Sequence, residues 1–396
     1  LLDLRSGVIA ITKCDLSESD WIDLVEDEIR ELVAGTFLEQ APIVRTSATT
    51  GQGMDEVRSQ LADAARRSLA ARPRTTEDAP FRMAIDRTFT IAGHGTVVTG
   101  SVSSGSCKLG DELIIEPGAV KVRVRGLQNH DRSVETLHRG QRAANNLAGI
   151  HHEQIGRGQE LASIGHLKPS RLLTVRIQMV ADASRPLKNR ARSRLHVGTA
   201  DLAATVVLLD ADAVRAGQSG LAQLFLAEPT VTTWNQPFVI RSPSPVVTIG
   251  GGQVLVPDAE KIRKPDKKLL SWITKLRSSD PLERAGAAIY FAGLREWQPR
   301  DLARTAGVDT TDTVYQRLRE QGVVAELPVS PTRALLVHRE VLDELCGRIQ
   351  AVLAALHEHN PLRTAIEQNQ LKKAFSYLDE VVLREALKLM RQDGKI

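Results

Sequence analysis

The segment that most constrains the fold runs from Phe81 to Gly100 and reads FRMAIDRTFTIAGHGTVVTG. Strand-forming residues flank Gly93-His94-Gly95, where glycine lets the backbone turn. We therefore predict a β-hairpin with these three residues at its tip. Hairpins of this kind build small β-barrels, so a barrel is expected around this segment.

A chain of 396 residues is too long for one hydrophobic core, and we expect three to five domains. The contents of 42% hydrophobic and 25% charged residues are typical of globular proteins. The apolar runs, such as Leu202–Leu209, have the length of strands, so no membrane span is predicted. The first residue is Leu1 rather than methionine, from which we expect a fragment.

Cysteine content and charge limit the classes of partner. Cys14, Cys107 and Cys346 are odd in number and far apart, and the sequence contains no CxxC. This usage favours a reducing cytoplasm over disulfides or zinc, so we predict no metal site. A formal net charge of +4 permits a nucleic-acid partner without requiring one.

Residues 1–71 have the β–loop–α–β–loop–α order of a doubly wound α/β domain. The predicted strands are Gly7–Ile11 and Pro42–Arg45. The predicted helices are about Ser17–Leu38, capped by Ser17 or Ser19, and Met54 to about Ala70. A polar segment follows each strand, at the edge where ligands bind in such sheets. The two segments are Thr12-Lys13-Cys14-Asp15 and Thr46-Ser47-Ala48.

A polar, proline-flanked linker is predicted at 72–79, followed by two β-barrels at 80–168 and 169–258. Both barrels are predicted because short strands alternate with turn-forming residues at close spacing. In the first barrel the expected strands, besides the hairpin, are Glu112–Ile115, Ala119–Val124 and Arg142–Leu147. In the second they are Leu173–Met179, Arg194–Val197, Ala203–Leu209, Gly220–Leu226, Phe238–Arg241 and Val246–Ile249, closing at Gly250–Gly252 and Val254–Val256.

From about Ala259 the apolar residues follow a helical periodicity. This pattern predicts two winged helices, one at 259–340 and an incomplete one at 341–396. The expected helices are Pro281–Ala292, Pro299–Ala306, Thr311–Gln321, Leu345–His357, Gln368–Phe375 and Glu380–Gln392. The expected wing is Val323–Leu327 with Ala334–Val337. On its own a winged helix is most often a DNA reader or a dimer surface. Arg317 and Arg319 are candidate recognition residues, but a structural role is the better interpretation.

The hairpin resembles the start of the second domain of translational GTPases, an elongation factor Tu-like barrel. Ile85-Asp86-Arg87 and the sequence SPSPVVTIGGG at Ser242–Gly252 resemble the SelB-type selenocysteine-specific elongation factors. Several motifs follow in that family's order across most of the chain. The resemblance implies the C-terminal part of a P-loop GTPase-type α/β domain, two β-barrels and winged-helix repeats. It also implies a cytoplasmic, GTP-dependent factor that delivers selenocysteinyl-tRNA to the ribosome.

By this resemblance, Thr12, Lys13, Asp15, Ser47 and Ala48 read guanine. The Asp15 carboxylate would accept two N–H donors of the base, and the Lys13 stem would lie along its face. Backbone N–H groups of Ser47-Ala48 would reach the guanine oxygen. A lone xKxD is weak evidence, but a downstream Ser-Ala after one helix and one strand strengthens it. Thr12 stands where the family has asparagine, which puts one set of loop-locking hydrogen bonds in doubt.

The motifs for phosphate chemistry are absent from the sequence. Neither GxxxxGK[ST] nor DxxG occurs, and the family's catalytic histidine belongs to that same upstream part. We therefore predict no catalytic residue and no GTP hydrolysis by this chain. GTP or GDP is expected as ligand of the guanine-reading part only, with Mg²⁺ in the intact protein.

The resemblance places Asp86, Arg87 and Arg142 at an aminoacyl pocket. A selenol is more acidic than the cysteine thiol, whose pKa is about 8.5, so selenocysteine presents an anion where serine presents a neutral hydroxyl. Two partly desolvated guanidiniums would favour the anion. Asp86 could hold one guanidinium or meet the α-amino group. The plainer alternative is a solvated arginine paired with a nearby carboxylate.

A basic run precedes LHVGTA at Leu195–Ala200. It could be an exposed loop whose charges only keep the chain soluble, whereas the resemblance implies contacts to tRNA phosphates. Its basic residues are Arg185, Lys188, Arg190, Arg192 and Arg194. The resemblance also implies binding to a selenoprotein mRNA hairpin, through last winged helices that this sequence lacks.

Two other functions stay open. A β-barrel and winged-helix protein could hold RNA without catalysis. A general elongation factor Tu-like GTPase is disfavoured by the helical tail and by the set of Asp86, Arg87 and Arg142. An upstream reading frame that encodes GxxxxGK[ST] and DxxG would distinguish a GTPase from a binding module.

Overall fold

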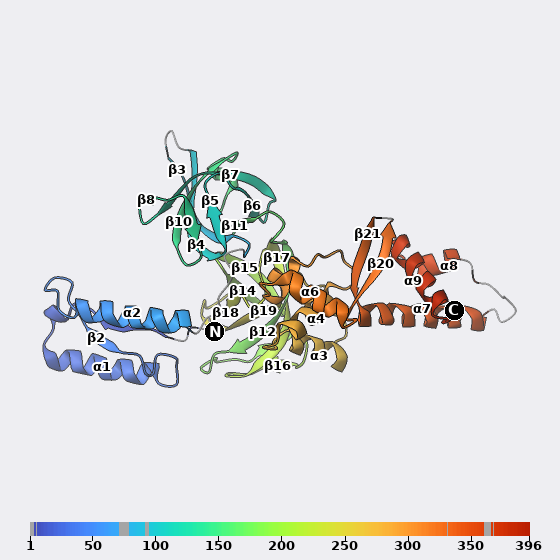
Figure 1. Ribbon diagram of the computed structural model, residues 1–396. Helices are drawn as coiled ribbons and strands as arrows, with labels where there is room; N and C mark the ends of the chain where they lie inside the picture. The colour runs from blue at the N-terminus through green and yellow to red at the C-terminus, as the bar shows by residue number, and fades with distance from the viewer. Residues whose placement is uncertain are drawn as a thin grey trace. The chain divides into compact units, whose positions relative to one another are not determined.

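The computed structural model describes residues 4, 6–70, 79–91, 95–330, 332–359, 366 and 368–396. The chain forms two compact units, Leu1–Thr75 and Thr76–Ile396 (Figure 1). Most of the predicted linker, and Gly93 and His94 of the predicted hairpin tip, lie outside the described residues. No helix in the described ranges has the length and apolar content that crossing a bilayer requires.

The first unit confirms the predicted α/β order. Its elements are β1 (Ile9–Ile11), the 3₁₀ helix η1 (Cys14–Leu16), α1 (Ser19–Val33), β2 (Ile43–Arg45) and α2 (Met54–Ala70). Strands β1 and β2 pair in parallel, with Ile11 opposite Arg45, so both polar segments leave the same edge of the sheet.

Helix α1 differs from its prediction at both ends. Neither Ser17 nor Ser19 caps it, because the N-cap position is Glu18 and no side chain caps the helix there. The helix ends at Val33 rather than near Leu38. Gly35 adopts a φ of 70°, and the Thr36 hydroxyl donates to the Val33 carbonyl at 2.6 Å, which satisfies a terminal acceptor.

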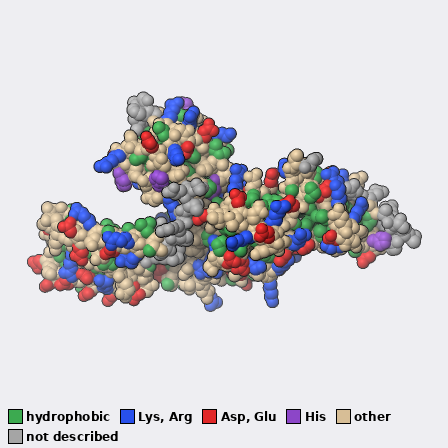
Figure 2. Space-filling model, viewed as in Figure 1, with side chains coloured by type: hydrophobic (Ala, Val, Ile, Leu, Met, Phe, Trp, Pro, Cys, Tyr) green, Lys and Arg blue, Asp and Glu red, His purple; other side chains and the backbone are tan. Residues whose placement is uncertain are grey.

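Much of the apolar stripe of α1 remains exposed. Val33 is buried, whereas Val25 is 40% and Leu32 is 79% exposed. Acidic side chains also gather along this helix (Figure 2). A two-stranded sheet offers too little surface to cover a helix of 15 residues.

The first barrel contains the predicted hairpin. Its longest antiparallel sheet has the order β10-β4-β3-β11-β6-β7-β8, and an additional pairing between β10 and β7 closes it. The predicted strands are confirmed, most of them longer by one to five residues. The strands are β3 (Arg82–Ile91), β4 (Gly95–Ser104), β5 (Ser106–Lys108), β6 (Glu112–Glu116), β7 (Val120–Asn129), β8 (Arg132–Ser133), β9 (Thr136–His138), β10 (Arg142–Ala148) and β11 (Glu160–Ser163), with 3₁₀ helix η2 (His152–Gln154).

The second barrel is closed in the order β12-β17-β15-β14-β18-β19. Its strands are β12 (Ser170–Met179), β14 (Ala191–Val197), β15 (Ala200–Leu208), β17 (Ser219–Thr230), β18 (Pro237–Arg241) and β19 (Thr248–Val256), with a small pair β13 (Leu187–Lys188) and β16 (Ala213–Val214).

The last strand of this barrel differs from its expected bounds, Val246–Ile249. Strand β19 begins at Thr248 and continues through Gly250–Gly252 to Val256. A Cβ on Gly252 would lie 1.9 Å from the Arg176 carbonyl oxygen of β12. Glycine is therefore required here so that two strands of the closing barrel can approach closely.

The helical remainder follows the predicted order. Its elements are α3 (Lys267–Lys275), α4 (Pro281–Ala292), α5 (Asp301–Ala306), α6 (Thr311–Glu320), the antiparallel hairpin β20 (Val324–Ser330) and β21 (Arg333–His338), α7 (Arg339–His359), α8 (Gln368–Ala374) and α9 (Glu380–Gln392). Helix α7 begins six residues before the predicted Leu345, directly after β21. Helix α4 has the predicted bounds, because the Asp280 side chain accepts from the Leu282 N–H at 3.0 Å and Pro281 follows the cap.

Hydrophobic cores cross both predicted boundaries in this part of the chain. Leu255 and Val256 of β19 share one cluster with Trp272 of α3 and residues of α4. The hairpin β20–β21 contributes to that cluster through Val324 and to a second one, with α7 and α9, through Leu327. The barrel and the helices after it therefore pack as neighbours through continuous apolar contact.

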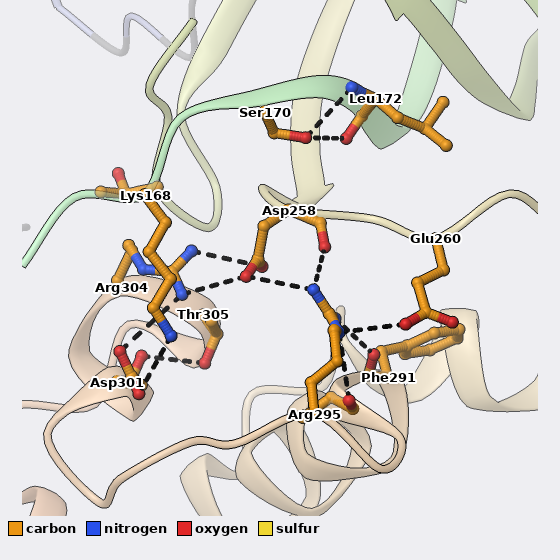
Figure 3. A network of polar contacts seen from close by, with 12 residues as sticks. Lys168, Ser170, Leu172, Asp258, Glu260, Phe291, Arg295, Asp301, Arg304 and Thr305 are labelled. Carbon is orange, nitrogen blue, oxygen red and sulfur yellow. Dashed lines mark hydrogen bonds and ion pairs between the residues drawn. The ribbon is translucent and has the colours of Figure 1, made fainter. Parts of the chain in front are cut away.

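A polar network lies beside the first of these clusters (Figure 3). Arg304 of α5 is 1% exposed and bonds Asp258, which follows β19, at 3.2 Å. Arg295 donates to the Asp258 carbonyl oxygen at 2.8 Å. Lys168, before β12, lies 3.4 Å from Asp301 of α5. These ion pairs join the entry and exit of the second barrel to the helices.

Candidate functional site

The predicted guanine-reading segments lie together in the first unit. The Thr46 N–H and hydroxyl both donate to the Ile11 carbonyl, at 2.7 and 2.9 Å. The Cys14 N–H donates to the Thr46 carbonyl at 3.1 Å. The loop after β1 and the loop after β2 are thus tied to each other by backbone contacts.

Within the first loop, Cys14 is buried and its neighbours are exposed. Lys13 has a φ of 60°, in the left-handed region, and its side chain and that of Asp15 are exposed. Cys14 between them is buried, and its thiol donates to the Ile11 carbonyl at 3.3 Å. Thr12 is exposed as well. The residues expected to touch a base therefore face solvent, and the cysteine anchors the loop.

In the second loop, the two predicted residues differ in what they can offer. The Ser47 N–H already donates to the Gln52 carbonyl at 3.1 Å, and its buried hydroxyl accepts from the Thr50 N–H at 3.1 Å. Ser47 therefore shapes the turn, and its predicted contact to a guanine oxygen is not available. The Ala48 N–H makes no hydrogen bond to another described residue, so it remains the candidate donor.

In the first barrel, a β-bulge arranges the second set of predicted residues. Ile85 pairs with Gly100 and Arg87 pairs with Thr99, so Asp86 is the extra residue in β3. A bulge disrupts the strict alternation of side chains and redirects them. Asp86 is half-buried and Arg87 is exposed, on the barrel's outer face.

Asp86 is the centre of this cluster. Its carboxylate accepts hydrogen bonds from both terminal nitrogens of Arg142 on β10, one of them at 2.9 Å, and from the Thr99 hydroxyl at 2.8 Å. Partial burial raises the pKa of Asp86. The hydrogen bonds from Arg142 and Thr99 and the charges of Arg142 and Arg87 outweigh that effect, so its pKa lies below the ordinary value. The bond to Asp86 likewise raises the pKa of Arg142.

The structure brings the three residues together but leaves them open to solvent. The Arg142 side chain is 47% exposed and that of Asp86 is 28% exposed. Arg87 forms no ion pair with another described residue. The predicted partial desolvation of the guanidiniums is therefore not seen, since nothing in the described chain covers this face. The cluster carries one net positive charge and could attract an anion.

The basic run of the second barrel divides into two groups. Arg185, Lys188, Arg190 and Arg192 are exposed. Arg194 is bound bidentately by Asp201, at 2.9 and 2.8 Å, so its charge is largely compensated. Four of the five predicted residues thus present charge to solvent.

A second arginine–carboxylate pair on β3 was not predicted from the sequence. Arg82 and Glu160 form a buried bidentate ion pair, and Arg82 also bonds Thr233 at 2.8 Å and Gln236 at 2.7 Å from the second barrel. These contacts join residues 78 to 154 positions apart. No local pattern could have revealed them.

Comparison with known proteins supports two of the domains directly. Residues 95–162 match the family model described as elongation factor Tu domain 2. Residues 174–261 match the model for the beta-barrel domain of selenocysteine-specific elongation factor. The chain thus has a multidomain, elongation factor Tu-like fold with β-barrels.

Longer relatives cover most of the chain. It is 32% identical over 377 residues to a selenocysteine-specific elongation factor of Desulfomicrobium baculatum, covering 95% of this chain and 58% of that protein. The crystal structure of a bacterial selenocysteine-specific elongation factor, EF-Sec, matches in fold with a TM-score of 0.70 at 22% identity, over 98% of this chain and 60% of that one. Elongation factor SelB from Methanococcus maripaludis, in complex with the GTP analogue GppNHp, matches with a TM-score of 0.55 at 25% identity, over 67% and 60%. The chain therefore spans about three-fifths of these relatives' lengths.

Proposed function

We propose that this chain, which resembles a selenocysteine-specific elongation factor over 95% of its length and matches the beta-barrel domain of such factors, belongs to the SelB-type family and serves the GTP-dependent delivery of selenocysteinyl-tRNA to the ribosome. The work of such a factor is cytoplasmic. The observation that carries the proposal is the binding of Arg142 by the Asp86 carboxylate, with the charge of Arg87 nearby, at the outer face of an elongation factor Tu-like barrel.

The cluster is suited to recognise the charge of the cargo amino acid. A selenol is more acidic than a thiol, so selenocysteine is an anion at neutral pH while serine stays neutral. The Asp86 carboxylate fixes the Arg142 guanidinium by two hydrogen bonds, which limits the entropy lost on binding. Arg87 adds a second positive charge nearby. The bound aminoacyl end would itself exclude water from this open face and so strengthen the attraction.

The first unit would contribute the reading of guanine. Asp15 would accept the two N–H donors of the base, Lys13 would lie along its face, and Ala48 would donate to its oxygen. Ser47 would support that turn from within, and Thr12 would border the loop. When bound, GTP supplies the free energy difference between two states of such a factor. Mg²⁺ would accompany the phosphates of the bound nucleotide.

The basic run would contact phosphates of the tRNA. Exposed Arg185, Lys188, Arg190 and Arg192 would each neutralise phosphate charge and steepen the dependence of binding on salt. Arg194, held by Asp201, would contribute less.

We further propose that the helical remainder consists of two winged helices. Helices α4 to α6 followed by the hairpin β20–β21 have the order of such a domain. In an elongation factor, these would act as a spacer or adapter that leads toward a selenoprotein mRNA hairpin. Residues Arg317 and Arg319 lie in the last turn of α6, and Arg319 is paired with Glu326 at 3.0 Å, which supports a structural role.

The cargo proposal is tested by Arg142→Ala in the full-length protein. Dissociation constants for selenocysteinyl-tRNA and seryl-tRNA are measured with the wild type and the variant. We expect the variant to lose roughly tenfold or more in affinity for selenocysteinyl-tRNA and little for seryl-tRNA.

The matched control is Arg125→Ala, which removes an exposed arginine from β7 of the same barrel. This control should leave the ratio of the two affinities unchanged. An equal loss for both tRNAs in Arg142→Ala would contradict recognition of cargo charge.

A binding module without catalysis is the second candidate. It is favoured by the lack of GxxxxGK[ST] and DxxG in the sequence. GTP hydrolysis by a chain of this sequence would exclude it.

A further inference from the structure

One residue of the second barrel reaches the backbone beside the Asp86 bulge. Thr199 lies in the turn between β14 and β15, where Val197 pairs with Ala200. Its hydroxyl donates to the Ile85 carbonyl at 2.7 Å and accepts from the Gly158 N–H at 3.1 Å. Its own carbonyl accepts from Arg157 Nε at 3.1 Å. Thr199 therefore contacts two separate segments of the first barrel.

The Thr199 hydroxyl donates a hydrogen bond to a backbone carbonyl of β3 at a position where β11 no longer pairs with that strand. Strand β11 begins at Glu160, which pairs with Ala84, so the ladder between β3 and β11 ends one residue before Ile85. The Ile85 N–H donates to the Gln159 carbonyl at 3.0 Å. The Ile85 carbonyl, on the same edge, is taken by Thr199. Backbone polar groups at such an edge need a partner, and here the other barrel supplies it.

This carbonyl belongs to the peptide group that joins Ile85 to the bulged Asp86. Its hydrogen bond fixes the orientation of that peptide plane, and hence the direction in which the Asp86 side chain leaves β3. Asp86 in turn holds the guanidinium of Arg142. The chain of contacts runs from Thr199 through one peptide plane to the charged cluster.

The turn that carries Thr199 is held in place from both sides. A Cβ on Gly158 would lie 3.3 Å from the Ala200 Cα, and one on Gly198 would lie 3.3 Å from Glu160 Oε1. Glu160 is itself fixed by Arg82, in the buried pair of the first barrel that borders the second barrel. Because the backbones are this close, the turn has little room to follow a shift of the bulge.

We propose that Thr199 is a positioning residue that sets the preference for an anionic over a neutral cargo amino acid. This inference rests on the proposed function of the Asp86 cluster. Without the hydroxyl, the Ile85 carbonyl and the Gly158 N–H lose their hydrogen-bond partner. The β-bulge at Asp86 then relaxes. As a result, Asp86 no longer holds the Arg142 guanidinium in the orientation in which Arg142 and Arg87 can attract the same anion. The attraction for an anion falls, whereas contacts to the rest of the tRNA are unchanged.

The test compares Thr199→Val, which keeps the shape but removes the hydroxyl, with Thr199→Ser, which keeps the hydroxyl. Affinities of the full-length protein for selenocysteinyl-tRNA and seryl-tRNA are measured at one salt concentration. We expect the ratio of the two affinities to fall roughly three- to tenfold in Thr199→Val, the effect of one hydrogen bond, and to stay within about twofold in Thr199→Ser. If Thr199→Val does not fold, Thr199→Ala removes the same hydroxyl.

The possible results distinguish the role of Thr199 from the proposed recognition of cargo charge by the Asp86 cluster. A wild-type protein that binds both tRNAs equally would overturn both. A wild type that discriminates, loses discrimination in Arg142→Ala and keeps it in Thr199→Val would overturn only the role of Thr199. An equal loss of affinity for both tRNAs in Thr199→Val would also overturn it, since a purely structural contact between the barrels predicts that result.

Discussion

Two arginine–carboxylate pairs start from the same strand, β3, and differ in almost every physical respect. In the pair of Arg82 and Glu160 the side chains are 9% and 4% exposed. In the pair of Arg142 and Asp86 they are 47% and 28% exposed. Only four positions separate Arg82 from Asp86 in the chain. Burial, rather than residue type, distinguishes a joint between barrels from a candidate binding cluster.

The buried pair is already bound by protein partners and has little capacity left for a ligand. Arg82 uses its donors on Glu160, Thr233 and Gln236. Two charges removed from water are stable only when their partners satisfy them fully, so the loss of one partner is costly. The exposed pair is partly hydrated, and its net contribution to stability is small. Its charges can therefore be rearranged by a ligand at little cost to the fold.

The largest expected effect is that of Arg82→Met. The variant leaves Glu160 buried without its partner, and we expect the second unit to lose about 3–5 kcal/mol of stability. The shift of the denaturant-unfolding transition measures the loss. Arg142→Met is the control from the exposed pair and should cost about 1 kcal/mol or less. Equal losses in the two variants would show that burial does not separate the pairs.

A smaller effect is expected at two helix ends that also differ in burial. Gly307 and Gly322 have φ values of 61° and 71°. A Cβ on Gly307 would lie 2.4 Å from the Trp234 ring, while one on Gly322 would meet nothing within 4 Å. Gly307→Ala should therefore destabilise by about 1–3 kcal/mol more than Gly322→Ala, because only the former adds overpacking to backbone strain. Thermal unfolding of both variants measures the difference, and identical shifts would contradict the packing around Trp234.

The third effect concerns the dependence of stability on pH. His338 is 3% exposed beside Trp272, and burial lowers its pKa to about 4. Between pH 6.5 and 4 the unfolded chain binds a proton that the folded chain excludes. The contribution of His338 to the free energy of unfolding is therefore fully present above pH 6.5. It falls as the pH drops, by roughly 1–3 kcal/mol at pH 5. Asp86, whose pKa is lowered, loses its contribution only at more acidic pH, as the carboxylate becomes protonated.

The variant His338→Asn keeps an acceptor for the Glu340 N–H, which His338 Nδ1 accepts at 3.1 Å, without a titrating ring. Its unfolding midpoint should depend less on pH over this range than that of the wild type. His152→Asn, at an exposed histidine, is the matched control. A variant His338→Asn with the wild-type pH dependence would rule out this source of acid sensitivity.

Elements specified by neighbouring residues were predictable from the sequence. Helices α2, α4 and α9 have the predicted bounds, and the strands that were predicted in both barrels lie near their expected positions. The short strands β5, β8, β9, β11, β13 and β16 were not predicted. The membership of Asp86 and Arg142 in one site followed from a resemblance rather than from periodicity. A pair between Asp86 and a guanidinium was one of the alternatives from the sequence, and the structure identified Arg142 as the partner. The hydrogen bond of the Ser47 N–H within its own turn was seen only in the structure.

By itself the sequence determined the order of α/β, barrel and helical parts, because capping, turn formation and apolar periodicity act within a few residues. The tertiary structure alone decided that β19 continues through three glycines, that Arg82 is buried while Arg142 is open, and that Thr199 bonds the Ile85 carbonyl 114 positions away. Burial and long-range hydrogen bonds depend on which surfaces meet when strands close into barrels. That information is spread over the whole chain and is carried by no single segment.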